Sequence, residues 1–99
     1  MIRVVIAEDE ALLRSGLIAL AERDGDIKIV AEADKGGAAV ARVRETRPDV
    51  VLMDIRMPGI DGIAATQVIM EDPELSNVSV LVLTTFAEDQ TVIEALRAG

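Results

Sequence analysis

The sequence contains no cysteine and no histidine. Their absence excludes disulfide bonds, thiol and imidazole nucleophiles, histidine general bases and structural zinc sites. Positive charge is also scarce, because ten Lys and Arg residues stand against eighteen Asp and Glu residues, a net charge of −8. Such a charge opposes direct binding to DNA or to an anionic membrane surface. Any chemistry of this chain must therefore rest on carboxylates, hydroxyls and the backbone.

Long apolar runs are missing as well. The N-terminal segment MIRVVIAEDE has a short apolar run broken by acids, and no stretch approaches the length of a transmembrane helix. We therefore expect no signal peptide, no membrane association and a cytoplasmic location. With 99 residues, 51% of them hydrophobic, the chain is long enough to build the core of one domain.

Short apolar runs alternate with stretches of helical period. The runs that predict strands are residues 4–7, 27–30, 50–53 and 80–83. Helices are predicted between them and after Glu88, with Asp61 as the N-cap of the third and Asp72-Pro73 as its end. This βαβαβαβα order predicts an α/β fold with a parallel sheet and helices on both faces. Continuous apolar character predicts burial on both faces for three strands, whereas Lys28 marks the second strand as an edge.

The fourth apolar run has the composition of a central strand, yet the sequence ends at EALRAG without a fifth run. An uncovered apolar edge strand invites association with other chains. The 99 residues would then be part of a longer protein, or another chain would cover the edge by pairing or swapping. Gly99 is typical of a helix end that leads onward, which favours the longer protein.

Acidic residues follow two of the predicted strands. Glu8 and Asp9 follow the first strand, Asp54 follows the third, and Thr84 follows the fourth. Open parallel sheets bind ligands at the carboxyl ends of their strands, where the strand order reverses, and a flavodoxin-like order 2-1-3-4-5 would bring these side chains together. Three close carboxylates must share protons or bind a cation, and hard oxygen ligands favour Mg²⁺ over Ca²⁺ here. A carboxylate held in such a site can act as a nucleophile toward a phosphoryl group.

Each of these residues also has a simpler interpretation. Asp54 alone would suit a helix N-cap or a turn, and the acids at positions 8–10 would suit the first turn of a helix. Thr84 alone would suit a strand. Their joint placement at the ends of three strands favours a common site, because the structural interpretation needs three independent coincidences.

Three motifs then resemble those of one known family. The segments VVIAEDE, DVVLMDIRMPGIDG and VLVLTTF, in this order, resemble the receiver domain of bacterial two-component response regulators over the whole length. The resemblance implies a flavodoxin-like sheet of order 2-1-3-4-(5), with residues 1–99 forming a receiver domain that lacks the fifth strand and fifth helix. It implies that Asp54 is the phosphoacceptor and Thr84 the switch hydroxyl. It further implies a Mg²⁺ ion bound by Asp9 and Asp54, by Glu8 through water, and by the backbone carbonyl of Arg56.

Two further expectations come from the same resemblance. Arg56 and Phe86 occupy positions that often tune dephosphorylation in this family. The family also uses a lysine after the fifth strand, which the 99 residues do not contain, and Arg56 and Arg97 are poor substitutes by position. We therefore expect weak phosphorylation of the 99 residues by themselves.

A finer resemblance concerns the output of the protein. Residues 8–40 resemble the NarL/FixJ (LuxR-type) subfamily, in which a DNA-binding helix-turn-helix domain follows the receiver. This implies a transcriptional regulator whose partners are a sensor histidine kinase, a second copy of the chain on activation or through the exposed fourth strand, and DNA through the missing C-terminal domain only. Such a protein is a phosphoacceptor rather than an enzyme, with at most self-catalysed phosphorylation and dephosphorylation.

Two alternatives remain open. A receiver-like interaction module that cannot be phosphorylated would keep the fold without the switch. A phosphatase of the haloacid-dehalogenase type would also use an aspartate at a strand end and Mg²⁺. Those enzymes need a second acid two residues after the nucleophile, where this sequence has Arg56.

Overall fold

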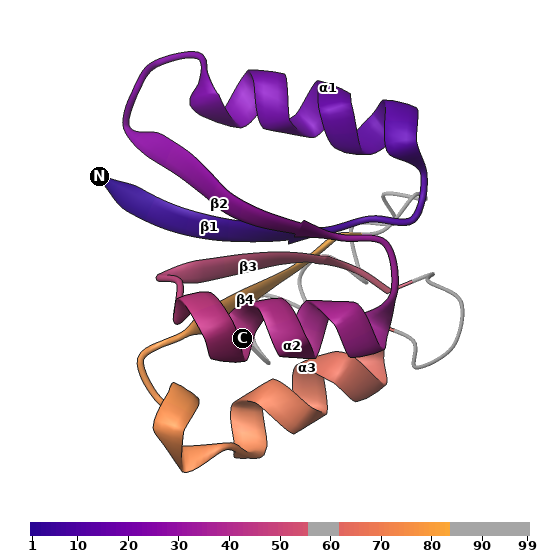
Figure 1. Cartoon of the computed structure of the whole chain (residues 1–99), viewed down its shortest axis with the longest axis vertical. Helices are drawn as coiled ribbons and strands as arrows, with labels where there is room; N and C mark the ends of the chain where they lie inside the picture. Colours follow the sequence, from indigo (N-terminus) through magenta and orange to yellow (C-terminus); the bar gives the residue numbers. More distant parts are fainter. Residues whose placement is uncertain (56–61, 84–99) are drawn as a thin grey trace.

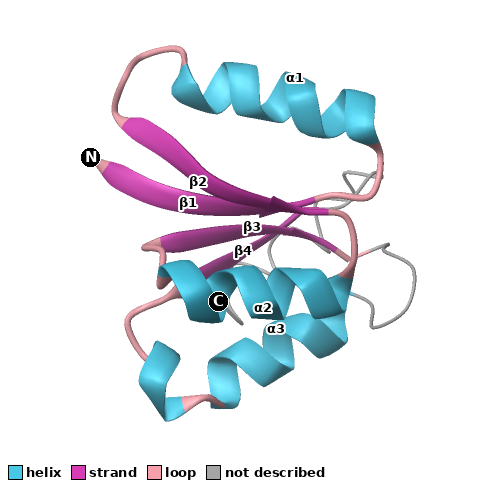
Figure 2. Ribbon diagram, viewed as in Figure 1, coloured by secondary structure: helices cyan, strands magenta, loops and turns pink. Residues whose placement is uncertain are grey.

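The computed structural model describes residues 1–55 and 62–83. In chain order, the elements are β1 (Ile2–Ala7), α1 (Ala11–Glu22), β2 (Ile27–Ala33), α2 (Gly36–Thr46), β3 (Val50–Asp54), α3 (Gly62–Glu71), the 3-10 helix η1 (Pro73–Leu75) and β4 (Ser79–Leu83). The strands form one parallel sheet in the order β2-β1-β3-β4 (Figure 2). This topology confirms the predicted flavodoxin-like fold and the edge position of β2, which carries Lys28.

The predicted end of the third helix is also confirmed. Helix α3 ends at Glu71, and the side chain of Asp72 accepts a 2.9 Å hydrogen bond from the backbone N–H of Glu74. Asp72 therefore caps η1, in which Pro73 occupies the first position. The predicted N-cap Asp61 and the predicted helix after Glu88 lie outside the described residues. Within the described ranges, none of the helices has the length and apolar character needed to cross a bilayer.

The helices divide between the two faces of the sheet. Helix α1 lies on one face, and α2 and α3 lie on the other (Figure 1). The face toward α2 and α3 holds the main core, in which Val5, Val43, Val51, Met53 and Ile69 are fully buried. The alternation of side chains along β1 and β3 directs every second residue into this core.

The opposite face is less completely covered. Val50, Leu52 and Leu81 are only half-buried, and α1 leaves Leu12 and Leu20 82% and 67% exposed. The prediction of burial on both faces therefore holds for β1, in which residues 4–7 are all buried. It holds only in part for β4, whose Val82 is half-buried against the main core, and for β3 and β4 on the side of α1. The reason is that α1 is the one helix on this face among residues 1–55 and 62–83, and one helix covers only part of a four-stranded sheet.

The strand register determines which residues meet at the carboxyl edge. Ala7 of β1 pairs with Met53 of β3, and Asp54 pairs with Leu83 of β4. Glu8 therefore leaves β1 directly beside Asp54, which ends β3. The carboxyl ends of the two neighbouring strands thus place two acids from distant parts of the sequence side by side.

Candidate functional site

Three carboxylates meet at the carboxyl edge of the sheet. One carboxylate oxygen from each of Glu8, Asp9 and Asp54 lies within 4.8 Å of the others. Glu8 and Asp54 are each only 4% exposed, whereas Asp9 is exposed to solvent. The structure thus brings together the three acids that the sequence singled out. Of the other candidates, Arg56, Thr84 and Phe86 lie outside the described residues.

The loop between β1 and α1 holds Glu8 in place. The backbone N–H of Glu8 donates a 2.9 Å hydrogen bond to the carbonyl of Ala33 at the end of β2. The carboxylate of Glu8 accepts a 3.0 Å hydrogen bond from the backbone N–H of Glu10, the residue before α1. Glu8 is therefore tied to the neighbouring strand by its backbone and to its own loop by its side chain.

Burial changes the acidity of Glu8. Desolvation is the main cause that raises its pKa, from 4.5 to about 7. Hydrogen bonding with the carboxyl groups of Asp9 and Asp54 and repulsion by the charge of Asp54 contribute to this increase in pKa, while the bond from the N–H of Glu10 opposes it. Near neutral pH, Glu8 is therefore close to the midpoint of its titration.

This pKa predicts a pH dependence of stability. The folded chain binds the Glu8 proton more tightly than the unfolded chain, so protonated Glu8 stabilises the fold. This contribution to the free energy of unfolding is complete below pH 4.5 and is lost as the pH rises through about 7. Without divalent cations, we expect this group to lower the free energy of unfolding by roughly 2–3 kcal/mol between pH 5 and pH 8. Urea unfolding in the presence of EDTA measures this change.

The Glu8→Gln variant isolates this contribution. Glutamine does not titrate, so the variant should lose less stability than the wild type over the same interval, and the difference between the two pH profiles belongs to Glu8. Parallel profiles would contradict the assignment of the shifted pKa to this residue.

The donor set suits a hard divalent cation. All three side chains offer carboxylate oxygens, two of them from buried residues at the ends of adjacent strands. Such oxygens are the ligands of Mg²⁺, which takes one or two carboxylates and keeps several waters. The exposed carboxylate of Asp9 leaves the cluster accessible from solvent. The residues present therefore fit a magnesium ion.

Gly62 is a site residue that the sequence patterns did not reveal. It begins α3 and donates a 3.2 Å hydrogen bond from its N–H to the carbonyl of Ile55. A Cβ atom at this position would lie 2.5 Å from Cα of Ile55 and would overlap the carbonyl oxygen of Asp54. Only glycine permits α3 to start against the backbone that carries Asp54. The signal available in the sequence was a glycine directly after Asp61, the predicted N-cap. This position does not reveal that Gly62 would lie against the backbone of Asp54.

The fold and the site together define a class of domain. A doubly wound parallel sheet with an acidic cluster at the carboxyl ends of its central strands belongs to the α/β domains that bind ligands at this edge. The chain belongs to the response regulator receiver domain family, whose sequence profile matches residues 4–99. Receiver domains are phosphoacceptors rather than classical enzymes.

Individual relatives agree with this family. The transcriptional regulatory protein LiaR of Bacillus subtilis is 42% identical over 99 residues, which cover 100% of this chain and 46% of LiaR. The signal receiver domain of the putative response regulator NarL from Mycobacterium tuberculosis has a TM-score of 0.84 at 36% identity, over 99% of this chain and 77% of that one. The chain therefore spans about half the length of the curated relatives it matches.

One similar solved structure is a complex that includes magnesium. The CheX–CheY–BeF₃–Mg²⁺ complex from Borrelia burgdorferi has a TM-score of 0.84 at 28% identity, over 99% of this chain and 72% of that chain.

Proposed function

We propose that this domain accepts a phosphoryl group on Asp54 from the phosphohistidine of a sensor histidine kinase, in a reaction that depends on Mg²⁺. The observation that carries the proposal is the convergence of the Glu8, Asp9 and Asp54 carboxylates within 4.8 Å at the ends of β1 and β3. Membership of the receiver family and the magnesium in the Borrelia CheY complex support it.

The proposed chemistry assigns a task to each of the three acids. A carboxylate oxygen of Asp54 attacks the phosphorus, the new O–P bond forms as the N–P bond to the donor imidazole breaks, and the imidazole leaves with the bonding electron pair. The product is an acyl phosphate on Asp54. When bound, a Mg²⁺ ion would offset the negative charge on the transferring oxygens. Asp9 and Asp54 would hold this ion directly and Glu8 through a water molecule.

Two assignments concern residues outside the described ranges. The backbone carbonyl of Arg56 would complete the protein ligands of the ion. The hydroxyl of Thr84 would donate a hydrogen bond to the phosphoryl group. Thr84 follows Leu83, which pairs with Asp54 in the sheet, so its place in the sequence supports this role.

The domain would control a transcriptional output. We assign residues 1–99 to the receiver domain of a cytoplasmic NarL/FixJ-type regulator, in which DNA is bound by a C-terminal domain and phosphorylation favours a homodimer. Two relatives support this assignment: LiaR, a transcriptional regulatory protein, and VraR, a response regulator protein. The chain matches 46% of the length of each, which leaves room in a full-length protein for a second domain. The net charge of −8 supports a separate DNA-binding surface.

Intact-mass spectrometry tests the proposed reaction. The full-length protein is incubated with a small-molecule phosphodonor and Mg²⁺, and in parallel with EDTA in place of the metal. We expect a mass increase of one phosphoryl group with Mg²⁺ and little or none with EDTA. Absence of an adduct under both conditions would favour the interaction module that cannot be phosphorylated. Continued turnover of a phosphate ester without an adduct would favour the phosphatase.

A further inference from the structure

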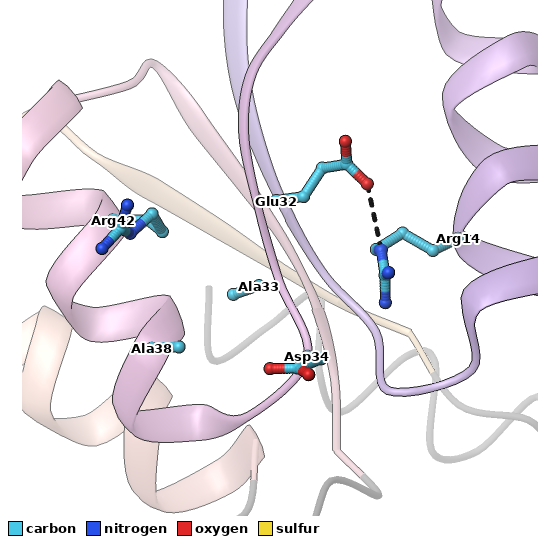
Figure 3. Close-up of a pocket in the computed structure, with 6 residues that line it drawn as sticks. All are labelled: Arg14, Glu32, Ala33, Asp34, Ala38 and Arg42. Carbon is cyan, nitrogen blue, oxygen red and sulfur yellow. Dashed lines mark hydrogen bonds and ion pairs between the residues drawn. The ribbon is translucent and has the colours of Figure 1, made fainter.

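The arginine of α1 that lies next to the acidic loop has no role in the chemistry above. Arg14 is half-buried, with 21% of its side chain exposed. Its Nη1 atom donates a 2.7 Å hydrogen bond to the backbone carbonyl of Glu8. Its Nε atom donates a 3.0 Å hydrogen bond to Glu32 of β2, an ion pair that is drawn in Figure 3. One guanidinium thus connects α1, the acidic loop and β2.

The bond to Glu8 restrains more than one atom. The carbonyl of Glu8 and the N–H of Asp9 belong to the same planar peptide unit, so fixing the carbonyl also fixes the orientation from which Asp9 departs. A charge-assisted hydrogen bond of 2.7 Å is among the stronger contacts available for this purpose. Glu10, the N-cap residue of α1, makes no side-chain capping hydrogen bond. Arg14 therefore supplies a restraint at the start of α1 that the capping residue does not.

We propose that Arg14 is a positioning residue, which holds the peptide between Glu8 and Asp9 in the orientation that brings their carboxylates together with Asp54. This inference rests on the proposed metal-dependent function. Glu32 has the supporting role of orienting the guanidinium. The two bonds leave from different nitrogen atoms of the rigid, planar guanidinium, and lysine, with its donors on one ammonium nitrogen, does not reproduce this geometry.

The sign of the effect on metal binding separates positioning from simple electrostatics. Removing a positive charge near a cation site strengthens cation binding if the charge acts only through its field. Removing a positioning residue weakens binding, and changes in groups that support metal ligands typically cost about 10–100-fold in affinity. We therefore expect Arg14→Met, which keeps much of the aliphatic stem, to bind Mn²⁺ about tenfold more weakly than the wild type.

Arg42 provides a matched control. It comes from α2 and lines the same cavity of about 210 Å³ as Arg14 (Figure 3). Its guanidinium forms an ion pair with Glu45 at 3.3 Å. Arg42→Met removes the same charge from the same cavity, so we expect Mn²⁺ affinity that is unchanged or slightly higher.

Two further variants test the Arg14 contacts. The Mn²⁺ affinity of Arg14→Lys should fall between those of Arg14→Met and the wild type. Glu32→Gln should change the affinity by about threefold or less, because it keeps an acceptor oxygen.

Two measurements on the full-length protein decide the question. Mn²⁺ affinity is measured by the electron paramagnetic resonance of the free ion, and amide hydrogen exchange is measured by NMR without metal. In Arg14→Met we expect faster exchange at the N–H groups of Glu8 and Glu10, with unchanged exchange in β3. Unchanged exchange in the loop, or Mn²⁺ affinity as high as that of Arg42→Met, would overturn the proposal. If the wild type binds no Mn²⁺, the proposed metal site fails, and the exchange data still decide whether Arg14 positions the loop.

Discussion

Replacing Asp54 by asparagine should abolish phosphorylation of the protein. The amide nitrogen and neutral carbonyl oxygen of asparagine cannot form the acyl phosphate, and the substitution changes the size of this 4% exposed side chain little. Intact-mass spectrometry with a phosphodonor and Mg²⁺ should therefore show no adduct in Asp54→Asn. Mn²⁺ binding should weaken about tenfold or more, since a charged ligand is lost.

The loss of function should not come from unfolding. The charge of Asp54 is one of the causes that raise the pKa of Glu8, so its removal relieves repulsion within the cluster. We expect the free energy of unfolding of Asp54→Asn at neutral pH to equal or exceed that of the wild type. Urea unfolding measured beside the mass experiment separates the two effects.

Asp49→Asn is the matched control for Asp54→Asn. Asp49 precedes the other end of β3, and its carboxylate accepts a 2.9 Å hydrogen bond from the backbone N–H of Arg3. The same substitution there should leave the phosphoryl adduct intact, because it is remote from the carboxyl edge. An adduct that persists in Asp54→Asn, or that disappears in both variants, would contradict the assignment of Asp54 as the phosphoacceptor.

Replacing Gly62 by alanine should destabilise the fold and disturb the site together. The added Cβ would overlap the carbonyl oxygen of Asp54, and relief of this contact requires α3 or the end of β3 to move. We expect a loss of about 2–3 kcal/mol in the free energy of unfolding, within the range for overpacking, and a fall in melting temperature of roughly 10 °C or more. Because Asp54 shares the displaced backbone, Mn²⁺ affinity should also fall.

Gly16→Ala is the control for the effect of glycine itself. Gly16 lies within α1 and is exposed, and a Cβ atom added there would meet no heavy atom within 4 Å. Alanine there should raise stability by about 0.5–1 kcal/mol, because glycine is unfavourable within a helix. Thermal unfolding of both variants provides the comparison. A Gly62→Ala protein as stable as Gly16→Ala would show that α3 does not need its close approach to β3.

Much of the fold follows from local patterns. The four apolar runs and the helical spacing between them predicted the parallel sheet, because strands alternating with helices require crossover connections of one hand. Lys28 indicated the edge strand β2, and Asp72-Pro73 indicated the end of α3, because charge and backbone restriction act within one element. The candidate acids were also accessible from the sequence, since Glu8, Asp9 and Asp54 each follow a predicted strand.

Other features depend on contacts that local patterns do not encode. Continuous apolar runs did not reveal that Leu52 and Leu81 would be only half-buried, because exposure depends on how many helices cover each face. Similarly, position along the chain pointed to Arg56 and Arg97 as the basic groups nearest the site. It did not point to Arg14, whose bond to Glu32 joins residues 18 positions apart.

The sequence by itself determined the order of the elements, the class of the fold and the acids that stand at the strand ends, because these depend on spacing along one chain. The tertiary structure decided how those acids interact. Burial between neighbouring strands raises the pKa of Glu8, the start of α3 requires the small size of Gly62, and the guanidinium of Arg14 fixes the loop. Each of these effects arises from distances of a few ångströms between residues of different elements, which only packing sets.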